Sequence, residues 1–178
     1  MNWLGHLIQK EINKNDTVLD LGCGIYQATS DSLTKEKFRD ANLKCKSVLG
    51  CEIVEKYIQR ACKYYPTIRF DVTNLDSYKM FADNSFDVVI CLDVLEHIDF
   101  QIVEKIIGEM KRIARKKAII YTPSKFVMNE DNVGNAWGMG ENPLQIHQSF
   151  VSPKYLNSVG FMTCFPAPDH NTLGVFTK

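Results

Sequence analysis

Short apolar runs alternate with helical segments along most of the chain, and this alternation restricts the possible folds more than any other feature. The runs occupy residues 17–21, 47–53, 67–71, 86–92 and 117–122. Near-continuous apolar runs are expected of parallel strands that are buried on both faces. Because strands that alternate with helices are typical of a doubly wound sheet, we predict an α/β, Rossmann-like fold with a mostly parallel sheet.

The spacing of apolar residues predicts the remaining elements. An apolar stripe at helical spacing predicts a helix over 100–115, and a second stripe predicts an N-terminal helix within 1–15. Near the C-terminus, 161–165 and 172–177 are predicted to form an antiparallel hairpin at one edge of the sheet. The length of 178 residues suits one domain, so we expect 1–178 to be a single domain.

The charge balance argues against two classes of partner. Lysine plus arginine and aspartate plus glutamate number 21 each, which leaves no basic footprint for nucleic acid or an anionic membrane. We interpret the densest basic cluster as a helix end that complements the helix dipole. It consists of Lys111, Arg112, Arg115, Lys116 and Lys117.

The cysteines and the N-terminus indicate the compartment. None of the six cysteines forms a Cys-x-x-Cys pair or a zinc-finger spacing with histidine, so no metal site is predicted. Free cysteines in apolar runs fit a reducing environment. The N-terminal residues lack the apolar stretch of a signal peptide, and no run is long enough to cross a bilayer. We therefore expect a cytoplasmic protein with no membrane partner.

Acidic residues stand at the ends of the predicted strands, where doubly wound sheets bind ligands. The first strand ends in Asp20, followed by Gly22, Cys23 and Gly24, so a ligand could approach the backbone beside a negative charge. That charge would repel a pyrophosphate and attract an ammonium group. Later strands end at Glu52, which suits a ribose diol. They also end at Asp71, which with the N–H of Val72 suits an adenine edge, and at Cys91-Leu92-Asp93.

These residues give the chain a resemblance to class I S-adenosylmethionine-dependent methyltransferases, in their broad small-substrate branch. The segment 18–24 resembles the first motif of that superfamily, and Leu95-Glu96-His97-Ile98 resembles a later one. The resemblance covers residues 16 to the C-terminus. The chain departs from it at Tyr26, where a third glycine is common, and in a longer loop before the second strand, around 42–46.

The resemblance implies a cofactor, S-adenosylmethionine, and a role for each motif residue. Asp20, Gly22, Cys23 and Gly24 would bind its methionine portion. Glu52 would hold the ribose, Ile53 would pack on the adenine, and Asp71 and Val72 would contact the adenine edge. Cys91 and Asp93 would lie close to the sulfonium.

Catalysis of methyl transfer to a hydroxyl or amine would use a base to remove a proton. His147, His97 and Asp93 are the candidates, although a structural histidine at a helix entrance fits His97 equally well. The long irregular stretch 123–151, rich in Asn and Gly, is predicted to form the acceptor pocket and a lid that carries Trp137.

We expect a small-molecule acceptor. Two other readings remain: a methyltransferase-fold binding protein without catalysis, and an NAD-type oxidoreductase. The sequence fingerprint of NAD-binding folds requires a third glycine, which would fall at position 27, and this chain has Gln27 there.

Overall fold

The computed structural model describes residues 3–24, 43–63, 65–126, 142–166 and 170–178. Within these ranges no helix is both long and apolar enough to cross a membrane. Tyr26, Gln27 and Trp137, on which parts of the sequence-based interpretation depend, lie outside the described residues.

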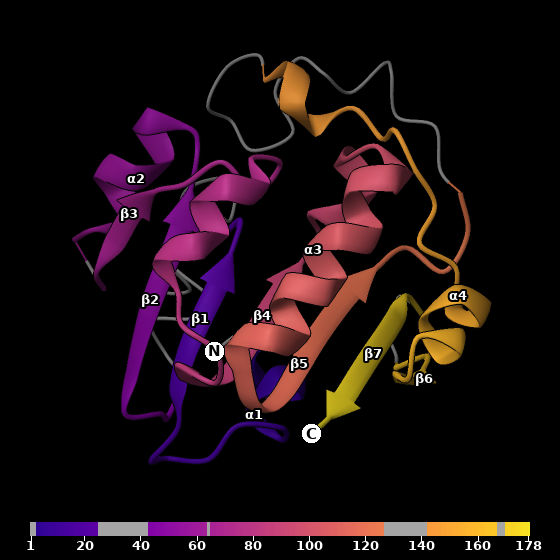
Figure 1. The fold of residues 1–178 in the computed structure, drawn as a ribbon, viewed down its shortest axis with the longest axis horizontal. Coiled ribbons are helices and arrows are strands. Elements are labelled where there is room, and N and C mark those ends of the chain that lie inside the picture. The colour runs from indigo at the N-terminus through magenta and orange to yellow at the C-terminus, as the bar shows by residue number, and fades with distance from the viewer. Residues whose placement is uncertain (1–2, 25–42, 64, 127–141, 167–169) are drawn as a thin grey trace.

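A seven-stranded sheet in the order β3-β2-β1-β4-β5-β7-β6 forms the centre of the molecule (Figure 1). Strands β1 to β5 are parallel to one another, whereas β7 runs antiparallel to both β5 and β6. The α/β fold and the antiparallel C-terminal pair predicted from sequence are therefore confirmed, with β7 inserted between β5 and the edge strand β6. The strands are β1 Thr17–Leu21, β2 Ser47–Glu52, β3 Thr67–Arg69, β4 Phe86–Leu92, β5 Ala114–Thr122, β6 Met162–Cys164 and β7 Thr172–Thr177.

Helices lie on both faces of this sheet, with α3 in front and α1 behind in the view of Figure 1. Short 3-10 turns follow β3 and β4 and precede α4 along the chain. The α-helices are α1 Trp3–Gln9, α2 Glu55–Ala61, α3 Phe100–Ile113 and α4 Pro153–Ser158. The 3-10 turns are η2 Leu75–Met80, η3 Leu95–His97 and η5 Pro143–Gln145.

Alternate residues of the central strands enter two separate cores, because successive side chains of a strand point to opposite faces. On β4, Val89 and Cys91 pack in the core beneath α3, and Val88 and Ile90 pack in the core beneath α1. All four side chains are fully buried. Burial on both faces explains why these strands appear in the sequence as continuous apolar runs.

The helix α3 begins where the sequence predicts and ends two residues earlier. Asp99 caps its start, with the side chain accepting a hydrogen bond from the Gln101 N–H at 2.8 Å. Ala114 already belongs to β5 and pairs with Phe86 of β4, so the predicted end at Arg115 is wrong. Ala114 and Arg115 belong to the strand because pairing with β4 satisfies backbone N–H and C=O groups that another helical turn would leave to solvent.

Two further sequence-based expectations are corrected at the amino ends of the strands. The N-terminal helix covers only Trp3–Gln9, although Ile12 beyond it is still buried in the core. Arg115, Lys116 and Lys117 do not lie at a helix end but on β5. There they pair with acidic side chains, as when Lys116 Nζ lies 2.6 Å from the carboxylate of the buried Asp16.

Candidate active site at the carboxyl edge of the sheet

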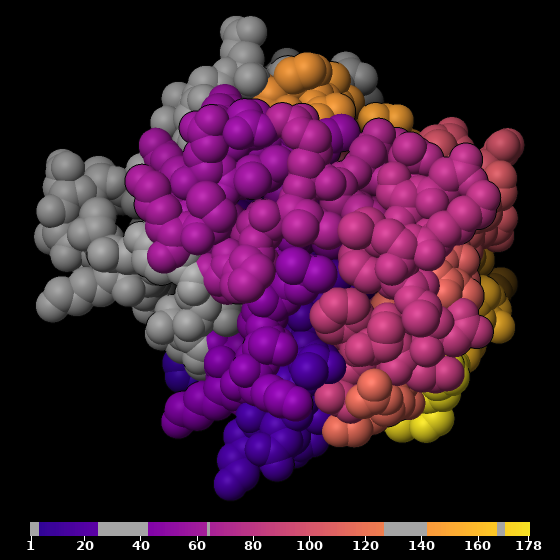
Figure 2. All heavy atoms as spheres, turned by 60° about the vertical axis from the view of Figure 1, so that its left-hand side comes forward, coloured from indigo at the N-terminus to yellow at the C-terminus, as the bar shows by residue number. Residues whose placement is uncertain are grey.

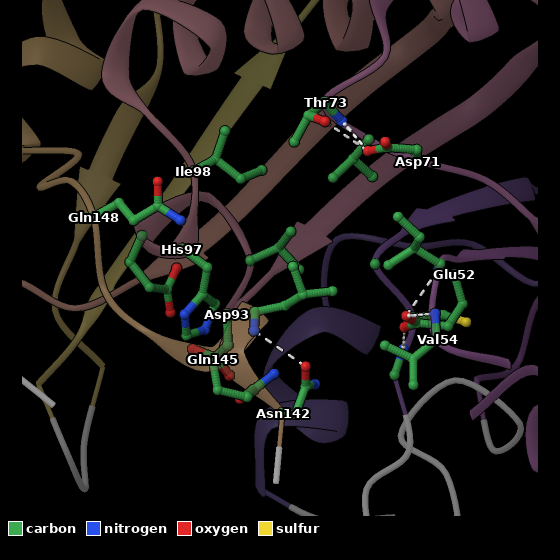
Figure 3. Close-up of a pocket in the computed structure, with 18 of the residues that line it drawn as sticks. Glu52, Val54, Asp71, Thr73, Asp93, His97, Ile98, Asn142, Gln145 and Gln148 are labelled. Atoms are coloured by element: carbon green, nitrogen blue, oxygen red, sulfur yellow. Dashed lines mark hydrogen bonds between the residues drawn. The ribbon is translucent and has the colours of Figure 1, made fainter. Parts of the chain in front are cut away.

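A cavity of about 550 Å³ opens at the carboxyl ends of β1, β2, β3 and β4. This volume falls within the range of small-molecule sites. Figure 3 shows Glu52 and Val54 on one side of the cavity and His97 and Gln148 on the other. The two sides come from segments far apart in the sequence, so only the folded chain forms the whole pocket.

The turn after β1 is a glycine loop held against its neighbours. Gly22 has φ +68° and Gly24 has φ +54°, values that L side chains rarely adopt. A Cβ added at Gly22 would come within 2.5 Å of Val94 Cγ2, so this backbone packs tightly on the segment after β4. The Cys23 N–H donates to the Cys51 carbonyl at 2.9 Å. The loop therefore presents its backbone at the pocket wall.

Glu52, the last residue of β2, organises this wall. Its side chain is buried, with 6% exposed, and lines the cavity. One carboxylate oxygen accepts the Gly24 N–H at 2.8 Å, and the other accepts the N–H groups of Ile53 at 2.8 Å and Val54 at 2.9 Å. The carboxylate thus joins the glycine loop of β1 to the end of β2 and is fixed at the surface of the pocket.

Asp71 and Val72 line the same cavity beyond β3, as does Ile53 beyond β2. The strand β3 ends at Arg69, two residues before the predicted end at Asp71. Asp71 instead starts a turn, in which its Oδ1 accepts from the N–H of Thr73 at 2.8 Å and from the Thr73 hydroxyl at 2.7 Å.

Two of the predicted cofactor residues stand behind the wall rather than in it. Asp20 and Cys91 have no exposed surface and are not among the described residues that line the cavity. Cys91 packs in the core beneath α3. The lining positions nearest to them in the sequence are Gly22, which follows β1, and Leu92 and Asp93 at the end of β4.

Asp93, immediately after β4, has an unusual backbone conformation. Its φ is +55°, which aspartate tolerates better than most residues, and its N–H donates to the Tyr121 carbonyl at 2.8 Å. Backbone outliers of this kind cluster at functional sites. The side chain lines the cavity, as the sequence-based assignment requires.

The candidate bases His97 and His147 meet on the opposite wall. Their ring centroids are 4.9 Å apart with planes inclined at 58°. His97 Nδ1 lies 3.3 Å from the carbonyl oxygen of Ile146. Burial lowers the pKa of His97 to about 4, and the neighbouring His147 adds to the lowering while the carbonyl contacts oppose it. His97 is therefore neutral at pH 7, and in this contact a neutral ring carries its proton on Nδ1.

Glu96 is the residue of this wall to which the sequence assigned no role. Its side chain is 4% exposed, lines the cavity, and accepts a hydrogen bond from the Thr122 hydroxyl at 3.3 Å. One signal was present in the sequence, since Glu96 precedes His97 in the Leu-Glu-His motif. The sequence could not show that the motif would meet His147, because fifty residues of chain separate them.

The segment after residue 141 covers the pocket edge. Asn142, Leu144, Gln145 and Gln148 line the cavity with His147; the stretch 123–151 was predicted to form the acceptor pocket, but these four residues were not named individually. Figure 2 shows these orange atoms at the top of the molecule, beside the purple atoms of the α2 region, and Figure 1 places the segment at the same end. The buried Asn142 lies 3.4 Å from the Tyr57 hydroxyl of α2, which links this segment to the β2 side.

The charge of the cavity lining is one-sided. Among the described residues that line it there are five carboxylates and neither a lysine nor an arginine. The carboxylates belong to Glu52, Asp71, Asp93, Glu96 and Asp99. Such a lining favours a cationic ligand and opposes a phosphate-rich one.

Comparison with known proteins identifies the family. Residues 19–122 match the family described as "Methyltransferase domain". An uncharacterized protein of Methanocaldococcus jannaschii is 28% identical over 91% of this chain and 70% of its own length.

Solved structures share the fold. A TehB-like S-adenosylmethionine-dependent methyltransferase of Corynebacterium glutamicum is 16% identical and has a TM-score of 0.61, covering 98% of this chain and 86% of its own. Magnesium protoporphyrin IX methyltransferase of Synechocystis, solved with bound S-adenosylmethionine, is 16% identical with a TM-score of 0.56, covering 98% and 76%.

The family match spans more than half of the chain and includes the end of β1, the glycine loop and the ends of β2 and β4. The match supports neither of the two alternative functions, an NAD-type oxidoreductase or a binding protein with a methyltransferase fold and no catalytic activity. The chain belongs to the methyltransferase domain family, within the class I S-adenosylmethionine-dependent superfamily that its motifs resemble.

Proposed function

We propose that this protein is an enzyme that transfers a methyl group from S-adenosylmethionine to a small-molecule acceptor. One observation carries the proposal: a single cavity joins the glycine loop and strand-end carboxylates on one wall to Glu96, His97 and His147 on the other. A cofactor held by the first wall would face an acceptor held by the second.

The residues of the first wall fit the cofactor chemically. The glycine backbone allows close approach, and the surrounding carboxylates favour a cationic sulfonium and ammonium. We assign Glu52 to the ribose hydroxyls and Ile53 to packing on the adenine. Asp71 and Val72 are assigned to the adenine edge. Gly22, Cys23 and Gly24 would line the methionine portion.

Asp20 and Cys91 act from behind this wall in our proposal. Asp20 is fully buried at the end of β1, so its negative charge would favour the cationic portion of the cofactor through the glycine loop. Cys91 would set the position of the backbone that leads to Asp93.

The bound cofactor would supply an electrophilic methyl group with a thioether as its leaving group. The protein must then align the acceptor, exclude water and accept a proton. His97 is a candidate to accept a proton because it is neutral at pH 7 and oriented by the Ile146 carbonyl, but the burial that lowers its pKa also makes it a weak base. His147 and Asp93 face the same cavity and complete the set of candidate groups.

A small-molecule acceptor fits the size and charge of the site. The cavity of about 550 Å³ is suited to a compact ligand, and its acidic lining opposes a nucleic-acid backbone. One structural neighbour carries the name of a small-molecule acceptor, magnesium protoporphyrin IX.

Thermal unfolding with added ligand tests the cofactor assignment. A ligand that binds only the folded state at about 100 times its Kd stabilises by about 2.7 kcal/mol, or about 5–10 °C in Tm for a chain of this size. We expect S-adenosylhomocysteine to give such a shift and NAD to give none. A shift with NAD and none with S-adenosylhomocysteine would refute the proposal.

A further inference from the structure

Three potential metal ligands converge on the acceptor wall of the pocket. Glu96 and His97 come from η3, and His147 comes from the segment after η5. One ligand atom of each residue lies within 4.8 Å of the ligand atoms of the other two. An ion placed among three atoms so spaced would be within coordination distance of each after small side-chain adjustments.

Neighbouring groups orient these ligands as outer-shell partners orient metal ligands. His97 Nδ1 lies 3.3 Å from the Ile146 carbonyl oxygen, and when Nδ1 donates to this carbonyl the lone pair of Nε2 is left for coordination. The Thr122 hydroxyl donates to the Glu96 carboxylate at 3.3 Å. Ligating histidines and carboxylates in proteins usually have such partners.

The backbone holds the two segments together independently of any ion. The Glu96 carbonyl accepts the N–H groups of Gln148 at 2.7 Å and Ser149 at 3.1 Å. The Ser149 hydroxyl donates to the Leu95 carbonyl at 3.1 Å. These bonds flank His147 on its C-terminal side, so the cluster is assembled by the fold.

The electrostatics of the pocket favour a cation at this place. Glu96 is a buried carboxylate, and none of the described lining residues is a lysine or an arginine. A buried carboxylate is costly unless a cation or several hydrogen bonds compensate it. A divalent ion at this place would add to the compensation that hydrogen bonds such as that of Thr122 give to Glu96.

We propose that Glu96, His97 and His147 bind a divalent first-row transition-metal ion that faces the pocket. Two imidazoles and one carboxylate form a ligand set for Zn²⁺, Co²⁺, Mn²⁺ or Fe²⁺ rather than for Mg²⁺ or Ca²⁺, which prefer oxygen ligands. The site departs from the sequence-based expectation of no metal, which considered only cysteine and histidine spacing.

The ion gives the acceptor wall a defined chemistry, and this step rests on the proposed methyltransferase function. Three protein ligands leave coordination positions open toward the cavity, where a hydroxyl oxygen of the acceptor can bind. With His97 as a ligand, its lone pair is not available to act as the base. The ion would instead lower the pKa of the bound hydroxyl, whose proton would pass to solvent, so that an oxyanion would be held in the pocket. The preferred acceptors are therefore hydroxylated small molecules.

Direct metal binding tests the site without any assay of methyl transfer. The full chain is treated with a chelator, dialysed and titrated with Co²⁺, whose absorption spectrum distinguishes thiolate from imidazole and carboxylate ligands. We expect one Co²⁺ per chain without a thiolate band, and much weaker binding of Mg²⁺. His97→Ala, His147→Ala and Glu96→Gln should each weaken Co²⁺ binding by at least about tenfold.

The matched control is His170→Asn. His170 is exposed and is not among the described residues that line the cavity, and asparagine tolerates its φ of +57°. This variant should bind Co²⁺ like the wild type. Circular dichroism shows whether each variant is folded. If His97→Ala fails to fold, His147→Ala tests the metal site instead, because His147 lies in an irregular, half-buried segment.

Three results would overturn the proposal: the absence of Co²⁺ binding by the wild type, Co²⁺ binding that survives in folded His147→Ala, or a spectrum dominated by thiolate ligands. S-adenosylhomocysteine binding is measured on the same samples. Cofactor binding without metal binding would reject the metal site alone, whereas metal binding without cofactor binding would reject the proposed function and leave the ion site standing.

Discussion

Carboxylates at the two ends of the sheet have opposite surroundings. At the amino ends of the strands, Asp16 and Asp87 are buried beside cations: Lys116 lies 2.6 Å from Asp16 and 3.1 Å from Asp87, and Arg115 lies 3.0 Å from Asp87. At the carboxyl ends, five carboxylates line a cavity to which no described lysine or arginine contributes.

The difference separates acids that stabilise the fold from acids that are available to a ligand. A carboxylate next to a lysine has its charge compensated within the protein. It therefore stabilises the folded state and exerts little electrostatic attraction on a cationic ligand. A carboxylate in a cavity without cations attracts such a ligand instead. Replacing an acid at one end should therefore change stability, and replacing an acid at the other should change binding.

Gly22→Ala should have the largest effect, because it disturbs the backbone on which the carboxyl end depends. The new Cβ would stand 2.5 Å from Val94 Cγ2 at a φ of +68°. Strain and overpacking together predict a loss of about 2–4 kcal/mol in the free energy of unfolding, with weakened S-adenosylhomocysteine binding. Urea denaturation and calorimetry measure the two quantities.

Gly108→Ala is the matched control for this substitution. Gly108 lies in α3, and a Cβ added there would meet nothing within 4 Å. This variant should gain up to about 1 kcal/mol in stability. Adding Val94→Ala to Gly22→Ala should recover part of the loss by removing the clash. Equal stabilities for the two alanine variants would contradict the tight packing of the glycine loop.

Glu52 is expected to contribute both to ligand binding and to the stability of the fold. Glu52→Ala should weaken S-adenosylhomocysteine binding by about 1–3 kcal/mol through the loss of charge-assisted hydrogen bonds. It should also reduce stability, because the N–H groups of Gly24, Ile53 and Val54 lose their acceptor. Calorimetry on the folded variant gives the binding term.

Glu52→Gln separates the two contributions. The amide keeps the size of the side chain and one oxygen acceptor but removes the charge, so stability should recover more than affinity does. Unchanged affinity in a folded Glu52→Ala protein would remove Glu52 from the cofactor site.

Replacing Asp87 should reduce the free energy of unfolding and leave ligand binding unchanged, and this effect should be smaller than those above. Burial alone would raise its pKa, but hydrogen bonds from the Thr17 N–H and from Lys116 outweigh burial and lower the pKa to about 2. A carboxyl group with a lowered pKa stabilises the fold above its ordinary value of 3.8. This contribution, about 1–2 kcal/mol, should disappear as the pH falls from about 4 to 2.

Urea denaturation of Asp87→Asn and wild type across this pH range checks the expectation. The variant should be less stable at pH 7, and the difference should shrink toward pH 2. Its S-adenosylhomocysteine affinity at pH 7 should equal that of the wild type. A loss of affinity comparable to that of Glu52→Ala would break the distinction between the two ends of the sheet.

The sequence by itself determined the features that depend on local patterns. Buried strands have continuous apolar runs, and the stripe of α3 has helical spacing, so both were predicted to within a few residues. The glycine loop and the acids at the ends of β2 and β4 were also predicted, because a parallel sheet brings its carboxyl ends to one edge. Whether 1–178 forms one domain stays a prediction.

Only the tertiary structure decided which of these acids and histidines meet. Asp16, Asp20, Glu52 and Asp87 all lie at or near strand ends in the sequence, yet Lys116 compensates the first and the last while Glu52 faces a cavity. Likewise Glu96 and His97 meet His147 across fifty residues. Contacts of this kind follow from the packing of whole elements rather than from neighbours in the chain, and so no local pattern contains them.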